Sequence, residues 1–165
     1  MKYAGVPMKR YPCLFVAVNL MLMLPWWNLS WAQPHQKDNE RTAHYLTTLL
    51  NVGRLIVERH QALINDPQKG DKGFTPESFE QQVVDEFFRQ TSIDLRHPPA
   101  HLPALATELL PILLESGTHV VADAQLVINQ RGIGYKNFIP ATFGSQAARK
   151  FSNRSRVKMK QTTLN

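Results

Sequence analysis

The sequence predicts an α+β fold, in which a long N-terminal helix packs on a domain with few strands and an incomplete sheet. Three observations lead to this prediction. Residues 72–95 repeat as residues 136–159 after a shift of 64 positions. An amphipathic stretch covers residues 38–64, and apolar and polar residues alternate from Val157 to Met159. The first stretch is typical of a helix and the alternation of a half-buried strand.

The two copies of the repeat share the start of a helix. Pro76 and Pro140 suit the first helical position, where the missing N–H would be unpaired anyway. Thr75 can cap the first helix, whereas Ile139 offers no side-chain cap to the second. The copies are either a chance agreement of two similar helix starts or the two helix–strand units of one domain. Six residue pairs are identical in this register: Lys72 and Lys136, Phe74 and Phe138, Pro76 and Pro140, Phe79 and Phe143, Gln82 and Gln146, Phe87 and Phe151.

The composition indicates one globular domain. The chain has 165 residues, of which 43% are hydrophobic and 19% charged, and its net charge is +6. A basic end could contact nucleic acid or anionic lipid, but no nucleic-acid motif is present and no aromatic residue beyond Phe151 interleaves it. We therefore expect no nucleic-acid partner and interpret the basic end as solvated. The basic residues gather at the two ends: Lys2, Lys9, Arg10 and Lys37, and then Lys150, Arg154, Arg156, Lys158 and Lys160.

Residues 1–32 have the pattern of an export signal peptide. A basic start precedes an apolar run over residues 14–24, and small residues at Ser30 and Ala32 favour cleavage after Ala32. The alternative is an uncleaved N-terminal anchor, although the run has about half of the ~20 apolar residues that a spanning helix needs. The domain would then comprise residues 33–165 in the periplasm or a lumen. Cys13 is the single cysteine, so no intrachain disulfide or cysteine-based haem attachment can form.

The long helix over residues 38–64 begins at Asp38 or Asn39, either of which can cap it. Gly53 is tolerated inside it at a cost of about 1 kcal/mol relative to Ala. Such a helix can hold a sensor domain against a membrane, or it can be a plain packing helix. Its apolar stripe comprises Leu46, Leu49, Leu50, Ile56, Leu63 and Ile64.

The remaining elements follow the repeat. Residues 76–90 are expected to form an amphipathic helix with acidic residues, including Glu86, on its solvent-exposed face. Residues 91–95 are expected to form a short strand. After a proline-rich loop, residues 104–130 read as a helix kinked near Pro111, either continuous or divided in two at Gly117. The two glycines of residues 131–135 mark a helix stop or a close backbone approach to a ligand. The second-copy helix covers residues 140–153 and precedes the second strand.

The sequence contains no credible catalytic set, so we expect no enzyme. His97 and His101 are four positions apart, but prolines between them prevent a shared helical face and make a metal pair weak. His119 and Asp123 are one helical turn apart and could pair. His44 and His60 are expected on the polar face of the long helix. Asp85 and Glu86 are neighbours that point in different directions on a helix, so they do not form a carboxylate pair.

The sequence Lys136-Asn137-Phe138-Ile139-Pro140-Ala141-Thr142-Phe143, with Phe151 and Lys160-Gln161-Thr162-Thr163-Leu164 behind it, resembles the Tll-type PAS-like haem domain. This family is frequent in cyanobacteria and in extracytoplasmic sensor regions of bacterial kinases and chemoreceptors. Its pattern is K-G-F-x-P-A-x-F, a helix, and then K-Q-T-S-L. Asn137 replaces the glycine here and Thr163 the serine. The similarity covers residues 38–165.

The resemblance implies an exported, non-catalytic, PAS-like domain that senses redox state or a small ligand, in some members through c-type haem. The family continues with further strands and a Cys-x-x-Cys-His attachment. Neither is present here, so the chain resembles the N-terminal part of such a protein, no haem ligand can be assigned and no cofactor is expected. The alternative is a small exported structural or interaction protein that uses its long helix and basic C-terminal strand against a membrane complex or an anionic surface.

Overall fold

Every regular element of the computed structural model, which describes residues 33–160, is a helix. The predicted α+β class with a PAS-like sheet is therefore wrong for this part of the chain. The chain divides between Lys37 and Asp38, and the packing described below is that of the second unit. The helices are α1 (Gln33–Arg59), α2 (Gln61–Ile64), α3 (Pro76–Thr91), α4 (Ala104–Asp123), α5 (Gln125–Ile128) and α6 (Pro140–Arg154).

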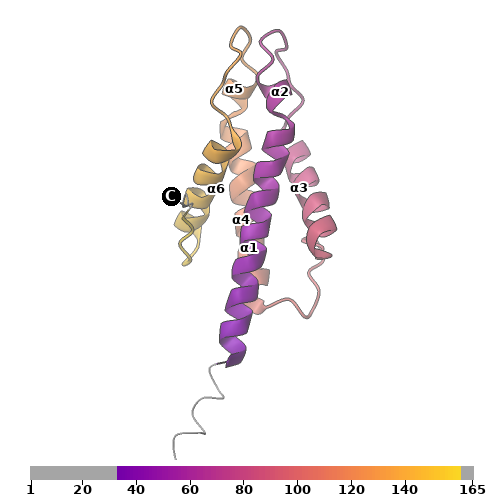
Figure 1. The fold of residues 1–165 in the computed structure, drawn as a ribbon, viewed down its shortest axis with the longest axis vertical. Coiled ribbons are helices and arrows are strands. Elements are labelled where there is room, and N and C mark those ends of the chain that lie inside the picture. The colour runs from indigo at the N-terminus through magenta and orange to yellow at the C-terminus, as the bar shows by residue number, and fades with distance from the viewer. Residues whose placement is uncertain (1–32, 161–165) are drawn as a thin grey trace, which may run out of the picture. The chain divides into compact units, whose positions relative to one another are not determined.

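The six helices form two equivalent halves. The first repeat contains α1, α2 and α3, and the second contains α4, α5 and α6. The shift of 64 positions places α2 on α5 and the start of α3 on the start of α6. In Figure 1, α1 and α4 run in the same direction through the middle, with α3 on one side and α6 on the other. The repeat is thus present, but as two helix–loop–helix units instead of two helix–strand units.

The helix starts follow the local sequence. Thr75 Oγ1 accepts a hydrogen bond from the Ser78 backbone N at 3.2 Å, as its capping position predicts, and Ile139 makes no side-chain cap. The two predicted long helices are each interrupted near their ends, between α1 and α2 and between α4 and α5. Pro111 lies inside α4 with an exposed side chain, and Gly117 does not divide that helix. Tertiary packing carries α4 through both residues.

The core is centred on the equivalent phenylalanines Phe79 and Phe143, whose rings meet edge to face with centroids 5.2 Å apart. Gly53 of α1 and Gly117 of α4 let these rings approach the helix backbones. A Cβ added at Gly53 would lie 2.8 Å from Phe143 Cε1, and one at Gly117 would lie 3.3 Å from Phe143 Cζ. The space left between the two repeats is about 10 Å³, so it is too small for a ligand.

Both predicted strands are absent from residues 33–160. Val157 and Met159 are half-buried and Lys158 between them is exposed, so the predicted alternation is real. The backbone there is extended but not paired with a strand in the described residues, and Met159 N instead donates to Ser152 Oγ at 2.9 Å. Alternation specifies which side chains face the core, whereas a strand also requires a neighbour to complete its hydrogen bonds.

The export signal and Cys13 lie outside the described residues. Among the helices of residues 33–160, none is sufficiently long and apolar to span a membrane. The predicted glycine turn is present: Gly132 has a φ of 78°, and its N–H donates to the Pro67 carbonyl oxygen at 2.9 Å. This hydrogen bond joins the loop of the second repeat to the loop of the first.

Candidate functional site

The loops of the two repeats, residues 65–75 and 129–139, lie side by side at the end of the molecule that we call the apex (Figure 1). Two equivalent asparagines join them. Asn129 Oδ1 accepts a hydrogen bond from Lys72 N at 2.9 Å, and Asn65 Oδ1 accepts one from Lys136 N at 3.3 Å. Each loop is thus held by the helix end of the other repeat.

Two equivalent glutamines add a second reciprocal pair of hydrogen bonds. Gln61 Nε2 donates to the Phe138 carbonyl oxygen at 2.8 Å, and Gln125 Nε2 donates to the Phe74 carbonyl oxygen at 3.0 Å. Because both carbonyls belong to loops, these side chains satisfy backbone groups that no helix or strand would satisfy. The apex is therefore a preformed structure instead of a pair of independent loops.

Two buried lysines complete the apex. The Lys136 side-chain ammonium donates to the Ile64 carbonyl oxygen at 2.6 Å, and that of Lys72 donates to the Asp66 carbonyl oxygen at 2.6 Å. Both carbonyls lie at or just beyond the end of α2, where a cation is favourable. Burial lowers the pKa of Lys136 below its ordinary value, and the nearby charge of Lys72 lowers it further.

The second repeat exposes an apolar surface at the apex. Five large hydrophobic side chains of the described residues are well exposed, and Phe88 alone lies elsewhere. The equivalent positions in the first repeat hold Ala62, Leu63, Lys69 and Asp71, of which two are charged. Exposed apolar clusters of this kind mark interaction sites. We call the cluster the apical patch; it consists of Leu126 (89% exposed), Val127 (42%), Ile133 (40%) and Tyr135 (66%).

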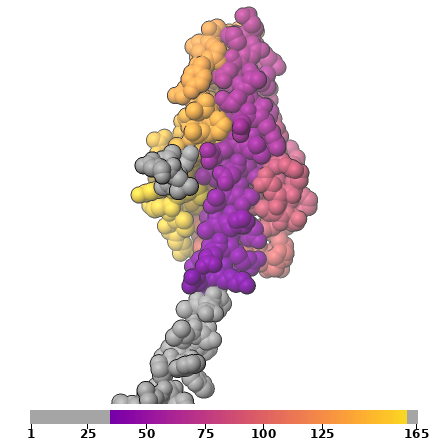
Figure 2. All heavy atoms as spheres, in the orientation of Figure 1, coloured from indigo at the N-terminus to yellow at the C-terminus, as the bar shows by residue number. Residues whose placement is uncertain are grey.

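Arg131 adds a positive charge beside the apical patch. Arg131 lies in the same loop, and residues 129–139 contain no acidic residue. The Arg131 side chain crosses to the first loop, where its Nε would be 2.6 Å from a Cβ added at Gly70. Figure 2 shows the loop of the second repeat, in orange, forming surface beside the first loop. The patch therefore combines apolar side chains, a tyrosine and an exposed cation on a braced backbone.

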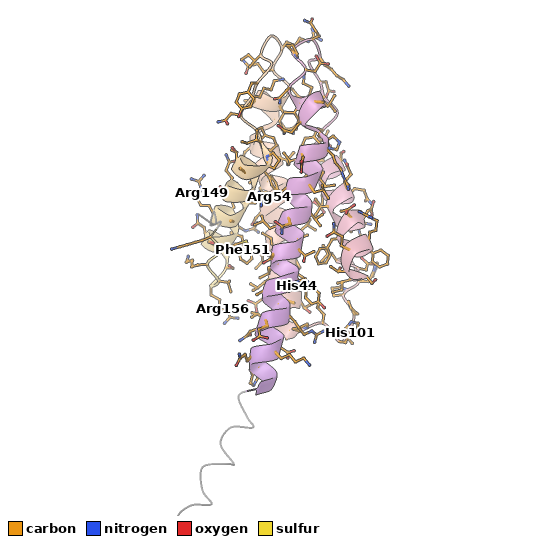
Figure 3. The ribbon with its side chains drawn as sticks, in the orientation of Figure 1. His44, Arg54, His101, Arg149, Phe151 and Arg156 are labelled. Atoms are coloured by element: carbon orange, nitrogen blue, oxygen red, sulfur yellow. The ribbon has the colours of Figure 1, made fainter. Side chains whose placement is uncertain are left out.

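The basic C-terminal end is mostly committed to the fold. Lys150 pairs with Asp123 at 2.7 Å, Arg154 with Glu115 at 2.5 Å and Arg156 with Glu108 at 3.1 Å. All three acids lie on α4, so these ion pairs join α6 and the segment after it to the central helix. An open groove of about 480 Å³ runs along α6, and its lining includes Arg149, Lys158 and Lys160. Arg149 projects from the outer side of α6 in Figure 3.

The predicted histidine candidates His44, His97, His101 and His119 are exposed. His97 is exposed beside Asp94 at 3.1 Å, and His101 is exposed in the following loop. His119 lies 3.7 Å from Glu115, whereas the predicted partner Asp123 pairs with Lys150. His44 is exposed on α1 (Figure 3). Within residues 33–160, no three histidine, cysteine or acidic side chains are grouped so as to hold a metal.

The prediction that Glu86 lies on the solvent-exposed face of α3 is wrong, because only 7% of the surface of Glu86 is exposed. Its carboxylate accepts from Arg89 at 2.5 Å, from Gln90 at 2.7 Å and from Arg59 at 3.2 Å. These hydrogen bonds, that from Arg89 above all, lower the pKa of Glu86 to about 2. The equivalent position in the second repeat is Lys150, so the ion pairs Arg59–Glu86 and Asp123–Lys150 have opposite polarity.

The asparagines and glutamines of the apex lie upstream of Lys72 and Lys136, where the predicted repeat begins, so the sequence prediction missed them. The same shift of 64 positions also aligns identical residues upstream, and this was the signal that could have found them. The upstream pairs include Gly53 and Gly117, Gln61 and Gln125, Ile64 and Ile128, and Asn65 and Asn129.

Comparison with protein-family models, curated proteins and solved structures finds no match to this chain. The resemblance to the Tll-type PAS-like haem domain therefore stays a prediction. The sheet on which that sensor-type function relies is absent from residues 33–160.

Proposed function

We propose that the protein is an exported, non-catalytic interaction module that docks on an anionic membrane surface through the apical patch. The observation that carries this proposal is the concentration of exposed apolar side chains at one end of the second repeat. Residues at the same positions of the first repeat include Lys69 and Asp71, so the fold itself does not require apolar side chains there.

The chemistry of the apical patch suits the boundary between lipid and water. Full burial of a Leu, Ile or Val side chain contributes about 1.5–3 kcal/mol, and a cation near an anionic surface about 1 kcal/mol. Tyr135 can keep its hydroxyl at the headgroups while its ring faces the acyl chains. Partial insertion of three aliphatic side chains together with Arg131 therefore supports a reversible attachment. The braced loops reduce the conformational entropy that ordering on the surface would otherwise cost.

The basic C-terminal end is a weaker candidate for this role. Lys150, Arg154 and Arg156 are paired with carboxylates of α4, so binding an anionic surface through them would break contacts that hold α6. The apical patch needs no such rearrangement.

The test uses sedimentation with vesicles of neutral phosphatidylcholine, alone or mixed with anionic phosphatidylglycerol. We expect the exported chain to pellet with the anionic vesicles and less with the neutral ones. The triple variant L126A/I133K/Y135D places the first-repeat residues in the patch and should weaken binding about tenfold or more. Phe88→Ala removes the exposed aromatic residue outside the patch and is the matched control.

Two results would overturn the proposal. One is a wild-type chain that stays in the supernatant with anionic vesicles. The other is a triple variant that keeps its fold, as judged by circular dichroism, and binds as the wild type does.

A further inference from the structure

The two outer helices carry opposite charges. Residues 140–160, which contain α6 and the segment after it, include basic residues but no acidic one. In α3 the acidic residues outnumber the basic one, Arg89. Figure 1 shows α3 and α6 on opposite sides of α1 and α4. The acidic and the basic surface therefore do not face each other within one chain, and they can meet only between two copies.

An exposed stripe runs along α3. Its members stand at positions i, i+4, i+8 and i+11, which share one face of a helix. All four side chains are exposed, and 53% of the surface of Phe88 is accessible. We call this surface the α3 stripe; it consists of Glu77, Gln81, Asp85 and Phe88.

The carboxylates of the α3 stripe have no cation partner. Neither Glu77 nor Asp85 forms an ion pair within residues 33–160. Asp85 accepts a hydrogen bond from Gln81 Nε2 at 2.8 Å, which leaves its negative charge uncompensated. The two nearby arginines are engaged elsewhere, Arg89 with Glu86 and Arg96 with Gln81. The stripe thus combines an exposed aromatic ring with two carboxylates that are available to a partner.

The groove along α6, which we call the α6 groove, has the opposite chemistry. Its charged lining residues are all basic and exposed: Arg149, Lys158 and Lys160. In the part of the chain that the structure describes, none of them pairs with a carboxylate. The Lys158 ammonium donates to the Ser152 carbonyl oxygen at 2.8 Å, a contact that leaves its charge in place. Ala148 and the half-buried Met159 supply the apolar part of the lining.

The internal repeat places the stripe and the groove on corresponding faces of their helices. The shift of 64 positions aligns Asp85 with Arg149 and Phe88 with Ser152. An acid in α3 is thus matched by an arginine in α6, and a large ring by a small side chain. The two surfaces are complementary in charge and in size at equivalent positions of the repeat.

We propose that the α3 stripe of one copy docks in the α6 groove of a second copy. Phe88 packs on the apolar part of the groove, while Glu77 and Asp85 face its cations. Burial of the ring supplies the apolar contribution, and the charges select the partner surface and its orientation. The contact comprises one helix face and one groove, so it is small and the association is weak.

The contact is heterologous, because a stripe meets a groove instead of a second stripe. Since α3 and α6 lie on opposite sides of the chain, two copies side by side make only one such contact (Figure 1). A free stripe and a free groove remain at the two ends of the pair. Further copies can therefore add head to tail, as heterologous contacts allow.

This association is independent of membrane docking. Neither the α3 stripe nor the α6 groove contains a residue of the apical patch. The vesicle test measures docking alone when it is run below the concentration at which copies associate.

Sedimentation velocity of the exported chain, from micromolar to millimolar concentration, tests the proposal. We expect the weight-average mass to rise with concentration and to pass that of a dimer without a plateau. In 1 M NaCl, where charges are screened beyond about 3 Å, the mass should fall toward that of the monomer. A monomer at every concentration, or a dimer that does not grow, would overturn the proposal.

Charge reversal identifies the two surfaces. Asp85→Arg and Arg149→Asp each bring like charges together and should weaken association about tenfold or more. The double variant D85R/R149D restores opposite charges across the contact and should recover association. Phe88→Ala should weaken it as well.

Two controls leave both surfaces intact. Glu58→Arg makes the same change of charge at an exposed position of α1 and should associate as the wild type does. The apical variant L126A/I133K/Y135D should also associate normally, which separates this contact from self-association through the apical patch. Undiminished association of folded Asp85→Arg or Arg149→Asp would overturn the proposal, and so would a folded D85R/R149D that stays monomeric.

Discussion

The first and second repeats share a backbone but present different surfaces. The identical residues, such as Asn65 and Asn129 or Phe79 and Phe143, lie where the repeats contact each other. Other residues differ at the apex, where the first repeat has Lys69 and Asp71 instead of apolar or aromatic side chains and covers Phe74 with His60. The identical positions therefore show what the contact between the repeats requires, and the positions that differ include those of the proposed docking surface.

The largest difference in stability is expected at the two core glycines. Gly53→Ala brings its Cβ to 2.8 Å from Phe143, which forces the ring to move, whereas Gly117→Ala brings it only to 3.3 Å. Overpacking costs about 1–3 kcal/mol and Ala gains about 1 kcal/mol in helix propensity. We expect a net loss of about 2 kcal/mol for Gly53→Ala and little change for Gly117→Ala, measured by urea unfolding. Adding Phe143→Leu should restore part of the loss; equal losses at both glycines would contradict this asymmetry.

The next difference concerns the ion pairs of opposite polarity. Because the pKa of Glu86 is lowered from 4.5 to about 2, the unfolded state binds the additional proton between these values. The stabilisation by Glu86 is therefore fully present above pH 4.5 and is lost as the pH falls toward 2. Glu86→Gln should cost about 1–2 kcal/mol at neutral pH, whereas Asp123→Asn, in an exposed pair, should cost about 0–0.5 kcal/mol.

Urea unfolding at neutral pH and in acid measures both effects. Glu86→Gln should flatten the acid dependence, and Asp123→Asn should leave most of it in place. If Glu86→Gln loses as much stability in acid as the wild type does, the loss arises from other carboxylates.

The smallest of the three effects is expected at alkaline pH. The lowered pKa of Lys136 means that the unfolded state binds more protons than the folded state between that pKa and 10.5. Stability should therefore rise as the pH increases through this window, and the neutral amine can still donate to the Ile64 carbonyl oxygen. Lys136→Gln should remove the rise in urea midpoint, and Lys69→Gln, at an exposed position of the first loop, should retain it.

Much of the helical structure was predictable from the sequence. Pro76 and Pro140 predicted the first residues of α3 and α6, and Thr75 predicted the side-chain cap of α3. The second strand prediction failed because the alternation around Lys158 shows only that Val157 and Met159 face the core. An extended segment that packs on a helix has the same alternation without being a strand. His97 and His101 are both exposed in the loop before α4.

The site could be predicted only in part. The burial of Glu86 depends on Arg59, which is 27 positions away, and the pairing of the basic end depends on α4, which is up to 48 positions away. Such contacts leave no local pattern. The exposure of Ile133 and Tyr135 is likewise a property of how the two loops meet, although the comparison with Lys69 and Asp71 was available in the sequence.

The opposite polarity of the two ion pairs has a consequence for the fidelity of folding. Two similar repeats in one chain risk assembling with α3 and α6 exchanged, and such misassembly is a common failure of repeat proteins. In the exchanged arrangement, Glu86 would face Asp123 and Lys150 would face Arg59. The two like charges within each pair would then repel each other. Each outer helix is therefore directed to the central helix of its own repeat.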